Sequence, residues 1–177
     1  LILLITISWI SRGQDTDATF SYLALGDSYT IGESVTKEQQ WPRQLRDSLL
    51  KKGMELGEPV IIAKTGWRTD EMLAAAKKNL DDQKFDLVSL LIGVNNEYQG
   101  KSPESFKSEF ERCLKYAIKR SKNGKEDVFF LSIPDYGYTP FGAENQERIT
   151  KRLNQYNEIC RQICEEYGVL FINITDI

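Results

Sequence analysis

The chain has 177 residues with a net charge of −3; 41% of them are hydrophobic and 28% are charged. This length fits one globular domain, and the small negative charge gives no reason to expect nucleic acid or an anionic membrane surface as a partner. The sequence contains no histidine and three cysteines without a C-x-x-C pair. It therefore predicts no metal site, buried cysteine side chains, and no imidazole chemistry supplied by these residues alone.

The N-terminal segment has the pattern of part of a secretory signal peptide. Residues 1–10 are nearly all apolar, and the chain turns polar at Ser11. A run of this length is too short to span a bilayer and suits the hydrophobic region of a leader. We expect residues 1–13 to be a partial signal peptide and residues 14–177 to be one exported domain without a stable membrane anchor. A buried N-terminal strand is the alternative interpretation.

Strand patterns and helix patterns alternate along the rest of the chain. Short, nearly continuous apolar runs predict buried strands at residues 20–26, 60–63, 87–92, 128–133 and 169–174. Apolar residues at helical spacing predict helices around residues 41–53, 69–80, 102–117 and 149–167. Thr69 and Asp70 are the expected caps of the second helix, and Ser102-Pro103 is expected to open the third.

This alternation predicts a doubly wound α/β domain. Continuous apolar strands are typical of a parallel sheet covered on both faces, so we expect a five-stranded parallel sheet in a three-layer α/β/α arrangement. A further helix after the fifth strand would be needed to complete the cover of the sheet. In open sheets of this class the functional site lies outside the carboxyl ends of the strands.

The residues that follow the first three strands carry groups suited to acyl transfer. Ser28 comes directly after the first strand, where its hydroxyl can attack a carbonyl carbon. Gly66 follows the second strand, and Asn95 follows the third. The Ser28 N–H, the Gly66 N–H and the Asn95 carboxamide could converge as donors to a developing oxyanion, each typically contributing about 3 kcal/mol to the transition state.

These motifs resemble those of the SGNH hydrolases, also called GDSL-type esterases and lipases. The family has G-D-S near the N-terminus, a single Gly after the second strand, and G-x-N-D after the third. The resemblance covers residues from about Phe20 onward and implies a flavodoxin-like fold, a serine nucleophile, a small-molecule ester substrate and no cofactor. The matching residues are Gly26, Asp27, Ser28, Gly66, Gly93 and Asn95, with Asn96 where the family usually has Asp.

The last motif of the family, D-x-x-H, is absent from these residues. It would supply the general-base histidine and the aspartate that orients it. Asp176 follows the fifth strand almost at once, whereas the family normally inserts a longer loop first. We therefore expect the two missing residues to lie beyond Ile177, and the 177 residues alone to have little or no esterase activity.

Four further residues are candidates for contact with the substrate. Trp67, Tyr136 and Tyr138 follow strand ends and could line an acyl or sugar pocket, although aromatic side chains there are as often plain packing. Asp27 is the fourth candidate, and it could equally brace the turn before Ser28.

Two other functions fit parts of the pattern. One is an exported domain that binds a glycan or lipid in the same crevice without turnover. The other is a phosphate-binding doubly wound domain, which is weaker because no Gly-rich loop follows the first strand.

Overall fold

The structure is a computed structural model that describes residues 19–175. The expected leader at residues 1–13 and Asp176 lie outside the described residues. The strands are β1 (Tyr22–Gly26), β2 (Val60–Ala63), β3 (Leu87–Leu91), β4 (Val128–Leu131) and β5 (Leu170–Ile172). The helices are α1 (Ser28–Ile31), α2 (Trp41–Leu50), α3 (Thr69–Asn79), α4 (Val94–Tyr98), α5 (Pro103–Arg120) and α6 (Gln146–Tyr167). The 3-10 turns are η1 (Lys37–Gln39), η2 (Gly124–Asp127), η3 (Tyr136–Tyr138) and η4 (Ala143–Asn145).

The five strands form one parallel sheet in the order β2-β1-β3-β4-β5. This is the strand order of flavodoxin-like doubly wound sheets, so the predicted fold class is confirmed. The inner strand β1 pairs with β2 on one side and β3 on the other, and its last residue, Gly26, lies beside Ala63 and Leu91. The segments that follow these three strands therefore begin next to one another.

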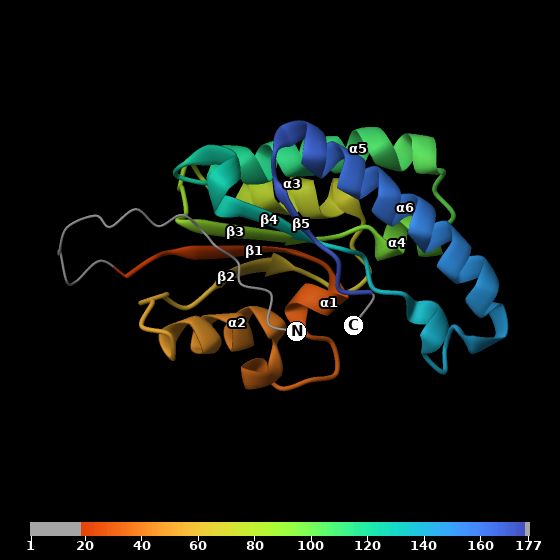
Figure 1. Ribbon diagram of the computed structural model, residues 1–177, viewed down its shortest axis with the longest axis horizontal. Coiled ribbons are helices and arrows are strands. Elements are labelled where there is room, and N and C mark those ends of the chain that lie inside the picture. The colour runs from red at the N-terminus through yellow and green to blue at the C-terminus, as the bar shows by residue number, and fades with distance from the viewer. Residues whose placement is uncertain (1–18, 176–177) are drawn as a thin grey trace.

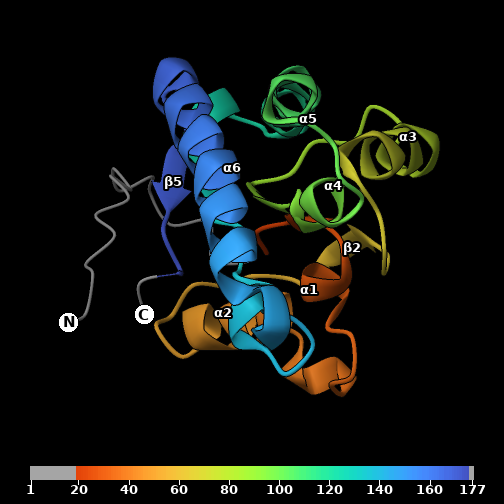
Figure 2. The same cartoon turned by 90° about the vertical axis from the view of Figure 1, so that its right-hand side faces the viewer.

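Helices cover both faces of the sheet (Figures 1 and 2). Helices α3, α5 and α6 lie on one face, whereas α1 and α2 lie on the other. The larger core cluster is formed where α3, α5 and α6 pack on the sheet, with Phe106, Phe110, Phe130 and Tyr156 stacked or edge-on to one another. A smaller cluster around Tyr22, Ala24 and Leu56 lies on the α2 face.

The α2 face is less completely covered over the outer strands. Burial alternates along β4, where Val128 and Phe130 are buried and Phe129 and Leu131 are partly exposed. On the neighbouring strand β5, Leu170 pairs with Phe129 and is 46% exposed. Within residues 19–175, no helix is long and apolar enough to cross a membrane.

The helix boundaries follow the sequence signals, with one correction at α3. Ser102 caps α5 as expected, because its hydroxyl accepts a hydrogen bond from the Ser105 N–H at 3.3 Å. Helix α3 begins at Thr69, but Thr69 does not cap it. The N-cap is Arg68, whose N–H donates to the Glu71 carboxylate at 3.0 Å. The Thr69 hydroxyl instead donates to Glu109 on α5, a buried contact that local sequence could not reveal.

Candidate active site

Ser28 is the first residue of α1, immediately after the end of β1. The turn needs glycine at position 26 because a Cβ there would lie 2.1 Å from Thr30 Oγ1 and 2.5 Å from the Leu91 carbonyl oxygen. Asp27 caps α1 by accepting a hydrogen bond from the Tyr29 N–H at 3.1 Å. Helix α1 then ends at Gly32, which has a left-handed backbone with φ of 69°. The short helix thus presents Ser28 at the carboxyl end of the sheet.

The Ser28 side chain is half-buried and has no partner in the described part of the chain. No group among residues 19–175 accepts a hydrogen bond from its hydroxyl, and its backbone N–H donates to none of them. The hydroxyl of the predicted nucleophile and the N–H predicted to donate to an oxyanion are therefore both free within the described residues.

Gly66 and Asn95 lie on the segments after β2 and β3, the two neighbours of β1. Gly66 has a φ of 82°, in the left-handed region that favours glycine, and its N–H has no acceptor among residues 19–175. The half-buried Asn95 uses Nδ2 to donate to the Trp67 carbonyl at 3.0 Å. Because the carboxamide nitrogen carries two hydrogens, one remains for a ligand oxygen.

Side chains of α4 and of Gln99, the residue directly after it, hold the β2–α3 loop in place. Besides the bond from Asn95 to Trp67, Gln99 Nε2 donates to the Gly66 carbonyl at 3.4 Å. Arg68 in turn donates to Gln99 Oε1 at 2.5 Å and pairs with Asp70 at 3.1 Å. The backbone on which Gly66 lies is therefore attached to the helix that carries Asn95.

Asp27 is 1% exposed, and its carboxylate caps α1 at the turn before Ser28. Burial raises the pKa of this carboxyl to about 7, although the hydrogen bond from the Tyr29 N–H acts in the opposite direction. Burial also raises the pKa of the neighbouring Tyr29, together with the charges of Asp27 and Asp135. Asp135 follows β4, so its charge reaches Tyr29, the residue after Ser28, from a fourth strand end.

The raised pKa of Asp27 predicts that stability falls as pH rises. The unfolded carboxyl loses its proton near 3.8, whereas the folded one keeps it until about 7. Unfolding therefore releases a proton between these values, and raising the pH from 5 to 8 should lower the free energy of unfolding by about 2 to 3 kcal/mol. Asp27→Asn keeps the acceptor for Tyr29 and should lack this loss. Urea unfolding at pH 5 and pH 8 measures this change in the free energy of unfolding. Asp47→Asn, at an exposed position, is the control and should show the same change with pH as the wild type.

The predicted aromatic contacts fall into different environments. Trp67 is partly buried against the larger core, on the loop between Gly66 and α3. Tyr136 is buried, and its hydroxyl donates to Glu97 Oε2 at 2.7 Å, so it packs the interior of the domain. Tyr138 is 74% exposed. The ring of Tyr136 contacts those of Tyr98 and Phe141, which extend this aromatic group to the surface.

Glu97 is a buried charged residue that sequence reasoning missed. Its side chain is 1% exposed and pairs with Arg152 Nε at 2.7 Å, in addition to the bond from Tyr136. It thereby joins α4 to α6 and η3. Nothing near Glu97 in the sequence signals this role, because Tyr136 and Arg152 are 39 and 55 residues away.

Two further features lie away from Ser28. A surface hollow of about 620 Å³ between α3 and α5, lined by Leu73, Tyr116 and Arg120 among others, shares no residue with the candidate site. Cys113, Cys160 and Cys164 are buried free thiols, and burial raises the pKa of each. Among residues 19–175 no cluster of three or more His, Cys, Asp or Glu side chains is arranged to hold a metal ion.

Comparison with known proteins gives two relatives of similar sequence. An arylesterase from Vibrio mimicus is 29% identical over 126 residues, which is 69% of this chain and 60% of that protein. An acetylxylan esterase from Geobacillus stearothermophilus is 25% identical over 161 residues, which is 86% of this chain and 65% of that protein. The chain thus spans less than two thirds of the length of these curated relatives.

A solved structure shows the same fold, and a family model matches the sequence. The crystal structure of AlinE4, an SGNH-hydrolase family esterase, superposes with a TM-score of 0.69 at 22% identity, covering 92% of this chain and 77% of that one, which shows a shared fold. The model of the GDSL-like lipase/acylhydrolase family matches residues 24–177. The match covers most of the chain and confirms the resemblance found in the motifs around Ser28, Gly66 and Asn95. The chain therefore belongs to the GDSL-like lipase/acylhydrolase family.

Proposed function

We propose that this chain carries the nucleophile and the oxyanion donors of a serine ester hydrolase. The observation that supports this most directly is Ser28, whose hydroxyl and N–H are both unpartnered among residues 19–175 at the carboxyl end of β1. Gly66 and Asn95 lie on the two adjacent strand ends with donor hydrogens to spare. A nucleophile beside several free donors is the arrangement that acyl transfer requires.

The reaction begins with attack of Ser28 Oγ on the carbonyl carbon of an ester while a base removes the hydroxyl proton. The carbonyl oxygen becomes an oxyanion, to which the Ser28 N–H, the Gly66 N–H and Asn95 Nδ2 donate. When the carbon–oxygen bond to the alcohol breaks, the base returns the proton to the leaving alcohol. Water then attacks the acyl-Ser28 ester by the same route, releasing a carboxylic acid and restoring the hydroxyl.

We propose that the general base and its orienting carboxylate come from outside these 177 residues. The sequence contains no histidine. Asp27, the carboxyl adjacent to Ser28 in sequence, is buried and accepts from the Tyr29 N–H. Because a serine hydroxyl is a weak nucleophile without a base, the 177-residue chain alone should hydrolyse p-nitrophenyl acetate poorly, whereas the protein expressed from its complete gene should be active. Robust hydrolysis by the 177-residue chain would contradict the missing-base proposal.

The proposed substrate is a small-molecule ester with a short acyl group. The curated relatives named an arylesterase and an acetylxylan esterase support this choice, since one of the names specifies an acetyl ester. No cofactor takes part in the proposed steps. Export of the protein stays a prediction from residues 1–13.

Labelling with a fluorophosphonate tests the proposed function. The probe phosphonylates a serine that has an activated hydroxyl and an oxyanion site. In the protein expressed from its complete gene, peptide mapping should find one adduct, on Ser28. Exposed serines such as Ser48 on α2 are the internal controls and should stay unmodified.

The labelling result also separates the two alternatives. A domain that binds a glycan or lipid without turnover, or a phosphate-binding domain, lacks an activated serine and should give no adduct on Ser28. Absence of the Ser28 adduct in the protein expressed from its complete gene would overturn the esterase proposal, and so would equal labelling of several serines.

A further inference from the structure

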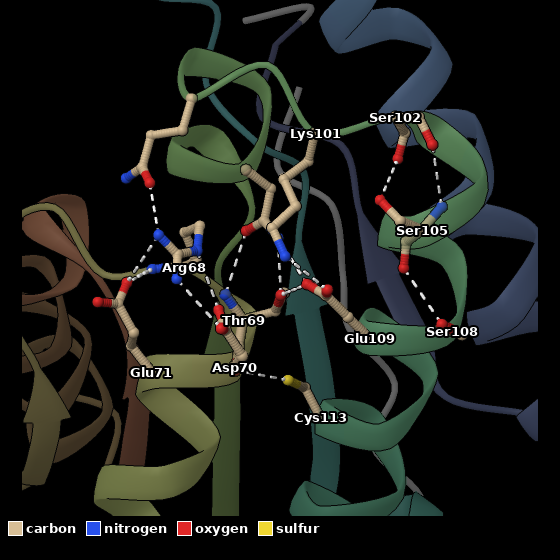
Figure 3. A network of polar contacts seen from close by, with 12 residues as sticks. Arg68, Thr69, Asp70, Glu71, Lys101, Ser102, Ser105, Ser108, Glu109 and Cys113 are labelled. Carbon is tan, nitrogen blue, oxygen red and sulfur yellow. Dashed lines mark hydrogen bonds and ion pairs between the residues drawn. The ribbon is translucent and has the colours of Figure 1, made fainter.

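A largely buried group of three polar side chains joins the β2–α3 loop, which carries Gly66, to helix α4, which carries Asn95 (Figure 3). Thr69 and Asn96 are both 0% exposed, and the side chain of Glu109 is 12% exposed. Thr69 begins α3, Asn96 lies on α4, and Glu109 lies on α5. In Figure 3, Glu109 and Lys101 point toward the N-terminal end of α3 at Thr69.

The hydrogen bonds within this group are complete and have a definite direction. Asn96 Oδ1 accepts from the Thr69 N–H at 3.1 Å, which fixes which end of the carboxamide is the oxygen. The other end, Nδ2, donates to Thr69 Oγ1 at 2.7 Å and to Glu109 Oε2 at 3.0 Å. The Thr69 hydroxyl donates to the same Glu109 oxygen at 2.6 Å. Glu109 is thus the acceptor on which the other two residues converge.

Glu109 is held in its charged form at this position. Its other oxygen, Oε1, pairs with Lys101 Nζ at 2.8 Å. Burial alone would raise the pKa of this carboxyl, but the hydrogen bonds from Lys101 and Thr69 outweigh burial and lower it below the usual value. An ionised acceptor strengthens the bonds from Asn96 and Thr69, since charge-assisted hydrogen bonds are roughly twice as strong as neutral ones.

Asn96 stands where the family motif that this chain resembles has Asp. An aspartate here could still accept from the Thr69 N–H. Its second oxygen, however, would then take the place of Nδ2, which lies 3.0 Å from Glu109 Oε2. Two carboxylates at this separation cannot both be ionised. The carboxylate of Glu109 and an amide at position 96 are therefore matched to each other.

The matched pair lies next to the groups that would bind an oxyanion. Asn96 directly follows Asn95, and Thr69 follows the loop containing Gly66 and Trp67. The Thr69 carbonyl additionally accepts from Cys113 Sγ at 3.3 Å, so α5 contacts this end of α3 twice. Movement of Thr69 relative to Asn96 would change the distance between Gly66 and Asn95.

We propose that Glu109 is a positioning residue, which supplies from α5 the buried carboxylate that holds Asn96 and Thr69 together and thereby sets the Gly66 and Asn95 donors. The proposal that Glu109 keeps the β2–α3 loop ordered is independent of the proposed function. Only the effect of Glu109 on turnover rests on the esterase proposal. Consequently an aspartate at position 96 is harmful in this chain unless Glu109 is neutralised.

A double-mutant cycle in the 177-residue chain tests the matched pair. Asn96→Asp should lower Tm by at least about 5 °C, because it buries two facing carboxyls. The double variant Asn96→Asp/Glu109→Gln exchanges the carboxylate and the amide, and should recover at least half of that loss. Asn154→Asp, at an exposed position on α6, is the matched control and should change Tm by less than about 2 °C.

Two readouts separate positioning from general stability. Amide hydrogen exchange of residues 67–69, whose N–H groups are hydrogen-bonded, should speed up at least about 10-fold in Asn96→Asp and return toward the wild-type rate in the double variant, at a temperature where both are folded. In the protein expressed from its complete gene, Asn96→Asp should lower kcat by at least about 10-fold with KM changed less than about 2-fold, and the double variant should regain activity.

The outcomes are distinguishable. An unchanged Tm in Asn96→Asp, or no recovery in the double variant, overturns the matched pair. Recovery of Tm with unchanged exchange at residues 67–69 overturns the positioning role and leaves Glu109 as a stabilising residue only. If the wild-type protein hydrolyses no ester, the esterase proposal fails, whereas the Tm and exchange cycles still decide the role of Glu109.

Discussion

Replacing Ser28 by alanine is expected to lower kcat for p-nitrophenyl acetate hydrolysis by at least about 10⁴-fold in the protein expressed from its complete gene. Alanine removes the only atom that forms the acyl-enzyme bond. The change should cost little stability, because the Ser28 hydroxyl makes no hydrogen bond within residues 19–175. Initial rates and Tm measured on the same preparation check both parts of this prediction.

A matched serine distinguishes this effect from the general consequences of losing a hydroxyl. Ser48 is exposed on α2 and donates to the Gln44 carbonyl at 2.7 Å. Ser48→Ala should therefore keep wild-type kcat and KM. More than about 1% residual kcat in Ser28→Ala would show that another group forms the bond, since loss of a catalytic nucleophile costs far more.

Replacing Asn95 by alanine is expected to lower kcat by about 10²- to 10³-fold with little change in KM. The physical reason is that the oxyanion exists only in the transition state and the intermediates, so its donor contributes little to binding of the ground-state ester. Asn95 also donates to the Trp67 carbonyl at 3.0 Å, and alanine removes that contact as well. Steady-state kinetics over a range of ester concentrations measures kcat and KM separately.

Gln99→Ala is the control for the structural part of the Asn95 effect. Gln99, the residue after α4, also bonds to the β2–α3 loop, because its side chain donates to the Gly66 carbonyl at 3.4 Å. The proposed mechanism gives Gln99 no bond to the oxyanion. Its loss should lower kcat by less than about 10-fold. Equal losses in the two variants, or a rise in KM without a fall in kcat, would show that Asn95 acts by holding the loop rather than by donating to the oxyanion.

Features that depend on local sequence were predicted correctly. The strand at residues 60–63 has the predicted bounds, and the helix opened by Ser102-Pro103 begins at Pro103. The predicted burial of residues 60–63 was wrong, because β2 lies at the edge of the sheet, where Val60 is exposed and the other three residues are partly exposed. A serine before a proline caps a helix through neighbouring atoms only. The placement of Ser28, Gly66 and Asn95 on adjacent strand ends followed because parallel strands present their carboxyl ends at one edge.

Features that depend on distant contacts were not predictable in this way. Thr69 has the residue type of a cap, yet its hydroxyl bonds to Glu109, which is 40 residues away. Tyr136 follows a strand like a site residue, yet its hydroxyl bonds to the buried Glu97. The residue types alone allow either use, and the choice depends on which partner the fold brings within about 3 Å.

The amino-acid sequence by itself determined the family and the order of strands and helices, and it supplied the candidate nucleophile and its candidate donors. These properties follow from apolar periodicity and from short motifs whose residues act within a few positions of one another. The tertiary structure alone decided that Asp27 is buried with a raised pKa and that Asn96 is matched to Glu109. Burial and pairing of charges are set by elements far apart in the chain, because their free energy depends on the surrounding atoms rather than on sequence neighbours.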